Sequence, residues 1–193
     1  MIRNGILCLE GDWDEGLRRR RSVVPVLDLL RASWNIPYIH RTASNRDEFR
    51  RVVQEWLKSK YRSYPILYLG VHGAPGVIDI GDESIPLRDL HEFTGKGAGR
   101  IVHFGSCETL SASKQELTRF LSRTKLTAIC GFRTEVDFLH SCALEILILD
   151  QLSSRRLTPK GMRAFKLRLH GMAGSLARNL GFHVWERRRL QSR

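Results

Sequence analysis

The sequence predicts a single-domain α/β protein with a mostly parallel central sheet that helices flank. Apolar runs of strand length alternate along the chain with segments of helical period, as in doubly wound sheets. Residues 66–71 (ILYLGV) are almost continuously apolar, which is typical of a parallel strand buried on both faces. The 193 residues are 42% hydrophobic, which is enough for one well-packed core. We therefore expect one domain over 1–193, ending in a basic tail from about residue 186.

The first part of the chain predicts three strands and two helices. The strand-like runs are residues 5–11, 36–40 and 66–71. Each of the two segments between them has an apolar stripe at helical spacing. The stripe of the first is Val23, Val26, Leu27, Leu30 and Trp34. The stripe of the second is Phe49, Val52, Val53, Trp56 and Leu57. A helix thus separates consecutive strands, as parallel pairing requires.

The middle of the chain predicts a hairpin and two more sheet strands. Residues 77–85 form the hairpin, with its turn at Gly81. A short helix is expected over 87–93. The apolar runs 100–105 and 126–132 predict the fourth and fifth strands. These strands extend the same parallel sheet.

Three further helices are expected after residue 105. Ser113 and Glu116 have the spacing of a capping box, ahead of a helix with an apolar stripe. That stripe is Leu117, Phe120 and Leu121. Residues 139–152 are apolar nearly all round and predict a deeply buried helix. Thr158 and Pro159 suit the N-cap and first position of the last helix. Its stripe is Met162, Phe165, Leu169, Met172 and Leu176.

The end of the chain is strongly basic. Gly181 closes the last helix, and residues 182–185 predict an edge strand. The chain carries 32 Lys and Arg against 20 Asp and Glu, a formal charge of +12. Residues 155–193 hold 11 basic residues and one acid, Glu186, and so account for +10. Such a surface suits an acidic partner or a phosphate-bearing ligand, and solvation alone explains it equally well. A nucleic-acid partner is not expected, although this basic region would permit one, because no zinc-finger spacing or aromatic-rich strand signature accompanies the charge.

The cysteines and the apolar segments indicate the cellular compartment. The four cysteines form no CxxC pair, which argues against a structural zinc site and a disulfide framework. They are Cys8, Cys107, Cys130 and Cys142. No metal or cofactor is expected. The start of the chain lacks the features of a signal peptide, and the longest apolar run is too short to span a bilayer. We expect a cytoplasmic protein with reduced thiols and no membrane contact.

A histidine and a cysteine each follow a predicted strand. His72 comes after 66–71 and Cys107 after 100–105, so in a parallel sheet both emerge at the edge where ligands gather. A histidine can take the proton of a thiol and return it to a leaving amine. The N–H groups of Gly73 and Cys107 would form an oxyanion hole, and a helix starting after Cys107 would favour the thiolate. Free cysteines are usually small buried hydrophobes, and we expect that of the other three.

These two segments resemble the paired signature of the caspase-like clan CD cysteine peptidases. In ILYLGVHG an apolar block ends in His-Gly, and in IVHFGSCETL a second ends in a small residue and Cys. The Cys-Glu-Thr run is most similar to the CHAT branch. The resemblance extends over the whole chain, because GFRTEVDF precedes an apolar helix as in the family. It implies a caspase-hemoglobinase three-layer sandwich, His72 as general base, Cys107 as nucleophile and peptide-bond hydrolysis. It also implies an effector, regulated in bacterial defence or stress.

The chain departs from the family pattern at three positions. Ser106 stands where alanine is usual. Phe132 and Arg133 occupy the region where CHAT proteins often carry a tryptophan, so the substrate pocket cannot be copied across. No helical repeat array accompanies the domain in this sequence. Regulation would then come from an activating partner protein, a small nucleotide ligand or assembly, or be absent.

Two sets of charged residues could form the substrate-binding pocket. Buried carboxylates of Glu135 and Asp137, after the fifth strand, would select Arg or Lys through charge-assisted hydrogen bonds. Alternatively Arg18 and Arg20, in the arginine run 18–21 after the first strand, would select an acidic side chain, as an arginine in a similar place does in caspases. We favour the carboxylates. Ordinary surface charge explains either set as well.

Two functions therefore compete. The first is a cysteine endopeptidase acting on protein or peptide substrates, which the His-Gly and Ser-Cys-Glu-Thr segments favour. The second is a catalytically inactive caspase-like module that binds a nucleotide signal or a partner protein. The small size of the chain and its basic C-terminal region favour the second. In that case Cys107 would be an unactivated thiol, and binding would survive its loss.

Overall fold

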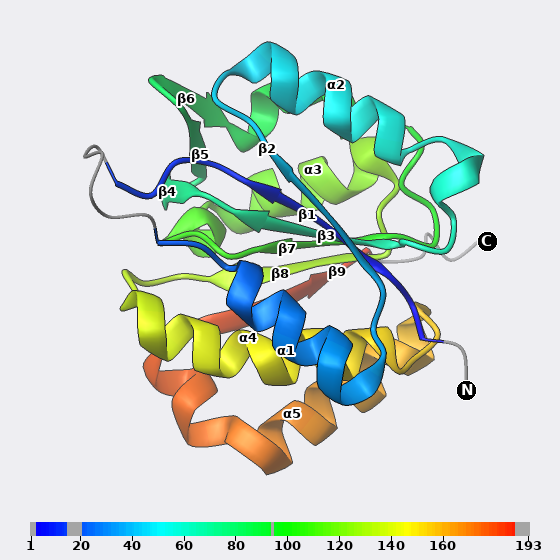
Figure 1. Cartoon of the computed structure of the whole chain (residues 1–193). Helices are drawn as coiled ribbons and strands as arrows, with labels where there is room; N and C mark the ends of the chain where they lie inside the picture. Colours follow the sequence, from blue (N-terminus) through cyan, green and yellow to red (C-terminus); the bar gives the residue numbers. More distant parts are fainter. Residues whose placement is uncertain (1–2, 15–20, 94, 188–193) are drawn as a thin grey trace, which may run out of the picture.

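The computed structural model describes residues 3–14, 21–93 and 95–187. Its centre is a six-stranded sheet with the strand order β2-β1-β3-β7-β8-β9 (Figure 1). Five neighbouring strands are parallel. They are β1 (Ile6–Glu10), β2 (Tyr38–Thr42), β3 (Ile66–Gly70), β7 (Ile101–Phe104) and β8 (Ala128–Phe132). The edge strand β9 (Phe182–Glu186) runs antiparallel to β8. The predicted mostly parallel sheet is confirmed.

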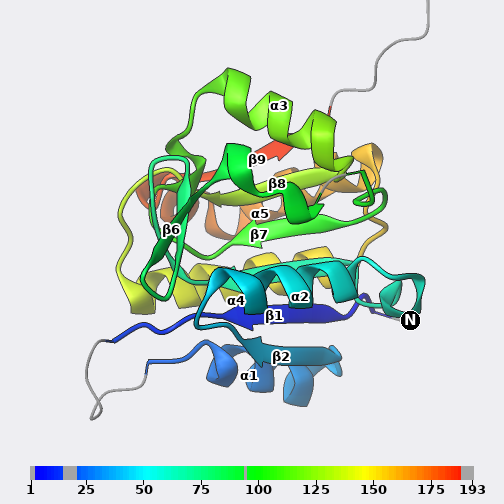
Figure 2. The same ribbon diagram turned by 90° about the horizontal axis from the view of Figure 1, so that it is seen from above.

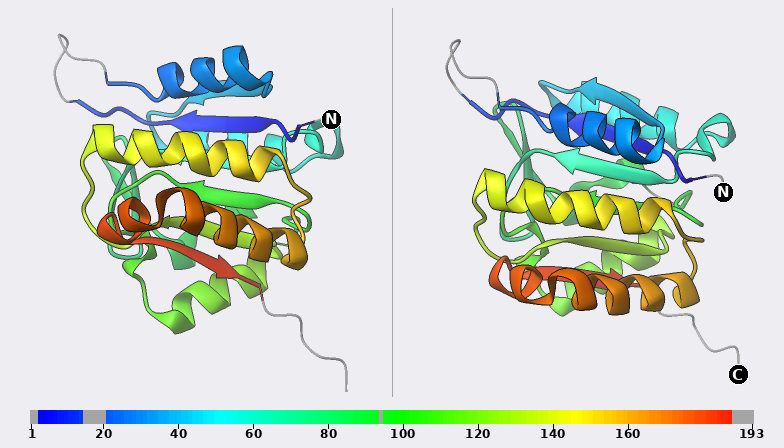
Figure 3. Two further views of the ribbon diagram at one scale, coloured as in Figure 1. Left: turned by 90° about the horizontal axis from the view of Figure 1, so that it is seen from below. Right: turned by 60° about the horizontal axis from the view of Figure 1, so that its bottom comes forward.

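Helices cover both faces of this sheet. One face carries α2 (Arg46–Trp56) and α3 (Lys114–Thr124). The other carries α1 (Val24–Trp34), α4 (Phe138–Ser153) and α5 (Pro159–Asn179). Figure 2 looks onto the first face, and Figure 3 shows α1, α4 and α5 lying side by side over the second. Each face has its own buried apolar cluster, so the fold has three layers with two cores. No helix among the described residues is long and apolar enough to cross a bilayer.

A second, three-stranded sheet lies between β3 and β7 in the chain. It consists of β4 (His72–Ala74), β5 (Val77–Ile80) and β6 (Glu83–Pro86), joined as antiparallel hairpins. The predicted hairpin is β5 and β6, and β4 is an additional strand that begins at His72. The helix expected over 87–93 is instead two short 3₁₀ turns, η2 (Leu87–Asp89) and η3 (His91–Phe93). A further turn, η1 (Ser59–Tyr61), precedes β3.

Local signals in the sequence fix several helix starts. Ser113 and Glu116 form the predicted capping box of α3, with reciprocal side-chain to backbone bonds. Thr158 caps α5 by accepting a hydrogen bond from the Gly161 N–H, ahead of Pro159. The stripe residues of α2 and α3 named above are buried as predicted. Helix propensity and apolar spacing thus agree with the tertiary structure in these elements.

Three apolar residues that were expected inside lie at the surface. Trp34 ends α1 and is 58% exposed, with the Arg3 guanidinium 5.2 Å from its ring centroid. Leu139, in the first turn of α4, is 73% exposed. Met172 is 50% exposed and precedes Ala173, whose φ of −146° breaks the helical path of α5. The apolar stripe of α5 therefore changes direction at this break, which a strict helical period does not anticipate.

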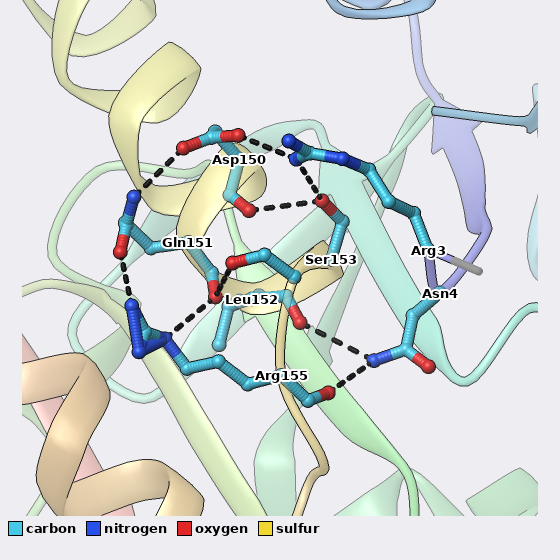
Figure 4. Close-up of polar contacts among 8 residues, drawn as sticks. Arg3, Asn4, Asp150, Gln151, Leu152, Ser153 and Arg155 are labelled. Carbon is cyan, nitrogen blue, oxygen red and sulfur yellow. Dashed lines mark hydrogen bonds and ion pairs between the residues drawn. The ribbon is translucent and has the colours of Figure 1, made fainter. Parts of the chain in front are cut away.

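The amino-terminal segment is tied to the end of α4 (Figure 4). The Arg3 guanidinium donates a 2.6 Å hydrogen bond to Asp150 Oδ1. The Asn4 side-chain amide donates to the carbonyl oxygens of Leu152 and Arg155, at 3.3 and 2.6 Å. These contacts fix α4 relative to β1 at the amino end of the parallel strands. The opposite end of α4 lies at the edge that holds the candidate site.

Candidate active site

His72 and Cys107 leave the sheet from neighbouring strands. β3 and β7 pair in parallel, with Leu69 opposite Phe104, so the segments that follow both strands emerge at the same edge. Their side chains line one cavity of about 80 Å³. The topology thus brings together the two residues that the strand-end argument singled out. Their catalytic roles stay a prediction.

Gly73 is packed directly against the cysteine loop. A Cβ atom at this position would lie 2.9 Å from the Cys107 carbonyl oxygen and 2.5 Å from Thr109 Oγ1. Thr109 is fully buried, and its hydroxyl donates a 2.9 Å hydrogen bond to the Val77 carbonyl oxygen in β5. The same hydroxyl lies 2.7 Å from Ser106 Oγ. The threonine of the Cys-Glu-Thr run therefore bonds the cysteine loop to the hairpin that carries His72.

The imidazole of His72 has a defined partner. Its Nε2 lies 3.1 Å from the Trp13 carbonyl oxygen. A carbonyl can only accept, so Nε2 carries the hydrogen and, in the neutral ring, Nδ1 is left unprotonated. The rings of His72 and Trp13 also meet edge to face, with centroids 5.3 Å apart. Trp13 was not predicted from the sequence, because a backbone carbonyl leaves no signature in residue type.

A buried carboxylate holds Trp13 in place. Glu10, the last residue of β1, accepts a 2.8 Å hydrogen bond from Trp13 Nε1. It also accepts from Ser22 Oγ at 2.8 Å, from the Val23 N–H at 2.7 Å and from His40 Nε2 at 2.7 Å. Burial would raise the pKa of Glu10, but the hydrogen bonds from His40, Val23, Trp13 and Ser22 outweigh it and lower the pKa. Glu10 is therefore ionised, and its hydrogen bonds hold together the segments on either side of residues 15–20.

Cys107 lies in a tight turn after β7. Its Sγ accepts a hydrogen bond from the Val136 N–H at 3.4 Å and lies 3.7 Å from the Val136 carbonyl oxygen. The next residue, Glu108, has a φ of 53°, a left-handed conformation that is costly outside glycine. Its N–H donates to the Thr134 carbonyl oxygen at 3.1 Å. Within the described ranges, the Cys107 N–H has no hydrogen-bond acceptor. Cys107 is partly exposed, whereas Cys8, Cys130 and Cys142 are buried as expected.

The helix that follows Cys107 begins at Lys114, where the capping box of Ser113 and Glu116 predicts its start. The cysteine loop first forms a three-residue 3₁₀ turn, η4 (Thr109–Ser111), and α3 starts only at Lys114. The turn η4 thus separates Cys107 from α3 along the chain, and the effect of the helix N-terminus on the Cys107 thiolate stays a prediction.

The floor of the cavity is polar. Glu145 of α4 is 2% exposed and lines it together with Tyr68 and Ser141. The Tyr68 hydroxyl donates a 2.5 Å hydrogen bond to Glu145 Oε2, and His103 Nε2 lies 3.3 Å from Oε1. Behind them, Cys130 Sγ lies 3.5 Å from His103 Nδ1. Burial lowers the pKa of His103, but Cys130 and Glu145 outweigh it and raise that pKa to about 10. The cavity thus rests on a buried His103 imidazolium that lies beside Glu145.

The predicted substrate-binding carboxylates lie outside the cavity. Glu135 and Asp137 are both exposed, and their neighbours Val136 and Phe138 line the cavity instead. The expectation that the two carboxylates are buried is wrong, because successive side chains of this non-helical segment face opposite ways. Asp137 instead caps α4, accepting a 2.9 Å hydrogen bond from the His140 N–H.

The alternative arginine set is only partly visible. Arg18 and Arg20 lie outside the described residues. Arg21 of the same run does line the cavity. Its guanidinium is bound to Asp14, with Nη2 and Nε at 2.6 and 2.9 Å from Oδ1. The cavity therefore presents a guanidinium at its mouth and a carboxylate at its floor. Among the described residues, no group of three or more His, Cys, Asp or Glu side chains could hold a metal ion.

The comparison with protein families gives one match over nearly the whole chain. The model described as "Family of unknown function (DUF6642)" matches residues 3–186. This range includes all elements of the central sheet, the hairpin that begins at His72 and the loop that carries Cys107. No curated protein matches the chain. The matched family thus covers the whole candidate site without indicating a reaction.

Proposed function

We propose that this chain, which belongs to the DUF6642 family, is a cysteine endopeptidase with a caspase-hemoglobinase-like fold, in which Cys107 is the nucleophile and His72 the general base. One observation carries the proposal: the two residues line the same cavity at the carboxyl ends of neighbouring parallel strands. Cys107 is also partly exposed, whereas the other three cysteines are buried. A catalytic thiol must be accessible to its substrate, whereas a cysteine that only packs in the core can be fully buried.

The hydrogen bond to Trp13 suits His72 for this role. Because Nε2 donates to the Trp13 carbonyl oxygen, Nδ1 is the nitrogen that accepts a proton. In the proposed first step, Nδ1 takes the thiol proton as Cys107 Sγ attacks the peptide carbonyl carbon, and the C=O π electron pair moves to oxygen. The resulting imidazolium is stabilised by the same Trp13 carbonyl. It then protonates the leaving amine as the C–N bond breaks and a thioester forms.

The second half of the reaction uses the same groups. Nδ1 takes a proton from water, the hydroxyl oxygen attacks the thioester carbon, and the C–S bond breaks to release the carboxylic acid. The proton returns to the thiolate. The Cys107 N–H, which has no acceptor within the described part of the chain, would donate to the oxyanion in both tetrahedral states. The Gly73 N–H is proposed as the second donor. No metal or cofactor takes part in these steps.

One observation favours the inactive binding module as a second candidate. Across the described ranges, no hydrogen bond joins His72 to Cys107. The thiol is instead held by the Val136 backbone and the imidazole by the Trp13 carbonyl oxygen. A peptidase of this kind would tighten its dyad when substrate enters the cavity, as catalytic hydrogen bonds often do. An inactive module would keep the two groups apart.

Labelling and cleavage distinguish the two candidates. The wild-type protein is incubated with electrophilic peptide probes and with a diverse peptide library, and mass spectrometry identifies the modified residue and the cleavage sites. We expect covalent labelling of Cys107 and peptide cleavage. Both should be lost in Cys107→Ala and strongly reduced in His72→Ala, with unchanged circular dichroism spectra.

The matched control is Cys142→Ala, which removes a buried thiol of α4. It should retain labelling and cleavage. Cleavage that persists in Cys107→Ala would sink the peptidase proposal. Labelling of Cys107 at the rate of an ordinary exposed thiol, with no cleavage by the wild type, would favour the inactive module.

A further inference from the structure

A second cavity lies on the opposite face of the sheet from α1, α4 and α5. It has a volume of about 270 Å³ and lies between α3 and η2. Its apolar lining consists of the buried side chains of Leu87, Leu90 and Phe120. Its charged lining consists of Arg88, Arg119, Arg123 and Glu116. The candidate active site does not include any of these residues.

The cavity gathers positive charge. Three guanidinium groups and one carboxylate line it, which leaves a formal excess of two positive charges. The carboxylate of Glu116 is already used by the helix cap, since its Oε2 accepts from the Ser113 N–H and hydroxyl at 3.3 and 3.0 Å. Arg119 and Arg123 are four positions apart on α3, a spacing at which like charges repel. An anion in the cavity would relieve this repulsion.

We propose that this cavity binds a phosphate-bearing small molecule of the nucleotide class. Guanidinium groups bind phosphate oxygens through paired, charge-assisted hydrogen bonds. Phe120 and the two leucines provide an apolar surface for a base. Small-ligand sites likewise combine apolar side chains with polar groups that fix the orientation of the ligand. A protein partner would instead need a contact surface of roughly 800 Å² on this side.

Both walls of the cavity connect to the candidate active site. The Leu87 N–H of η2 donates a 2.9 Å hydrogen bond to the Gly76 carbonyl oxygen, in the turn of the hairpin that begins at His72. α3 is the helix that follows the Cys107 loop. The Arg123 guanidinium joins the two walls by donating to the Arg88 carbonyl oxygen at 3.2 Å. A ligand that bridges α3 and η2 would therefore alter the reactivity of Cys107. This effect rests on the proposed function, whereas the binding does not.

The test is a calorimetric titration of the full chain with ATP, inorganic pyrophosphate and adenosine. We expect saturable binding of ATP, weaker binding of pyrophosphate and little binding of adenosine. The double variant Arg119→Ala/Arg123→Ala should weaken ATP binding by about tenfold or more. The matched control Arg163→Ala/Arg168→Ala removes the same charge from exposed positions of α5 on the other face. It should bind ATP like the wild type.

The outcomes separate this site from the peptidase proposal. Cys107→Ala should still bind ATP, so a failed cleavage assay leaves the binding result intact. Absence of saturable ATP and pyrophosphate binding would overturn the inference. Equal loss in the α5 control would do the same, because it would show attraction by net charge alone. Binding of an acidic peptide that depends on Arg119 and Arg123, without ATP binding, would replace the small molecule by a protein partner.

Discussion

Two buried carboxylates lie near the candidate active site, and they differ in the parts of the fold to which they are hydrogen-bonded. Glu10 is 4% exposed and accepts four hydrogen bonds, most of them from the segments on either side of residues 15–20. Glu145 is 2% exposed and bonds to Tyr68 and His103, which belong to the central strands β3 and β7. Glu10 thus organises a surface segment that reaches His72 through Trp13. Glu145 joins a helix to the interior of the sheet.

The two clusters also respond oppositely to pH. The pKa of Glu10 is lowered in the folded protein, so its contribution to stability is present above its ordinary pKa and is lost as the pH falls. The pKa of His103 is raised from 6.5 to about 10, so its contribution is complete below pH 6.5 and is lost as the pH rises toward 10. The hydrogen bonds of Glu10 thus lose their contribution to stability in acid, whereas the contact between His103 and Glu145 loses its contribution in alkali.

The largest expected effect follows from breaking the interior pair. Glu145→Gln leaves the His103 imidazolium buried without its counter-ion, and we expect the free energy of unfolding at pH 7 to fall by about 3–5 kcal/mol. Urea denaturation followed by circular dichroism measures it. Glu135→Gln, which neutralises an exposed carboxylate, is the control and should change little. A loss below about 1 kcal/mol would show that the pair is not ionised.

The second effect tests the hydrogen bonds that Glu10 accepts. Glu10→Gln turns an acceptor with two oxygens into a group with one, so some of the four donors lose their partner. We expect a loss of about 1–3 kcal/mol in the free energy of unfolding. We also expect slower labelling of Cys107, because Trp13 would no longer be held where its carbonyl oxygen accepts a hydrogen bond from His72. Glu145→Gln should affect labelling less than stability, and the reverse result would contradict the assignment of the two clusters.

The sequence predicted the frame of the site better than its interior. Strand and helix periods located β3 and β7, and the strand-end rule brought His72 and Cys107 to one edge, because both depend on local pattern. The contact between Tyr68 and Glu145 joins positions 77 apart, and no local pattern encodes it. One signal was present: Glu145 interrupts the apolar run 142–149, which marks a buried acid that needs a partner. Glu135, which the sequence suggests as a buried acid, is exposed.

The third effect is the alkaline loss of stability. Between pH 6.5 and about 10 the folded protein binds one proton more than the unfolded chain at His103, so the free energy of unfolding should fall by about 1.4 kcal/mol per pH unit. Urea midpoints at several pH values measure this slope. His103→Phe removes the titrating group and should flatten the slope in this range. An unchanged slope in that variant would assign the alkaline loss to other groups.

The smallest expected effect separates the contribution of Glu10 to stability from its role in holding Trp13 beside His72. Ser22→Ala removes one donor to the Glu10 carboxylate and leaves the Trp13 and His40 contacts in place. We expect a loss of about 1 kcal/mol in the free energy of unfolding. Because Trp13 keeps its bond to Glu10, the labelling rate of Cys107 should stay at the wild-type value. A slower rate in Ser22→Ala would mean that the whole cluster, rather than the Glu10–Trp13 contact, positions His72.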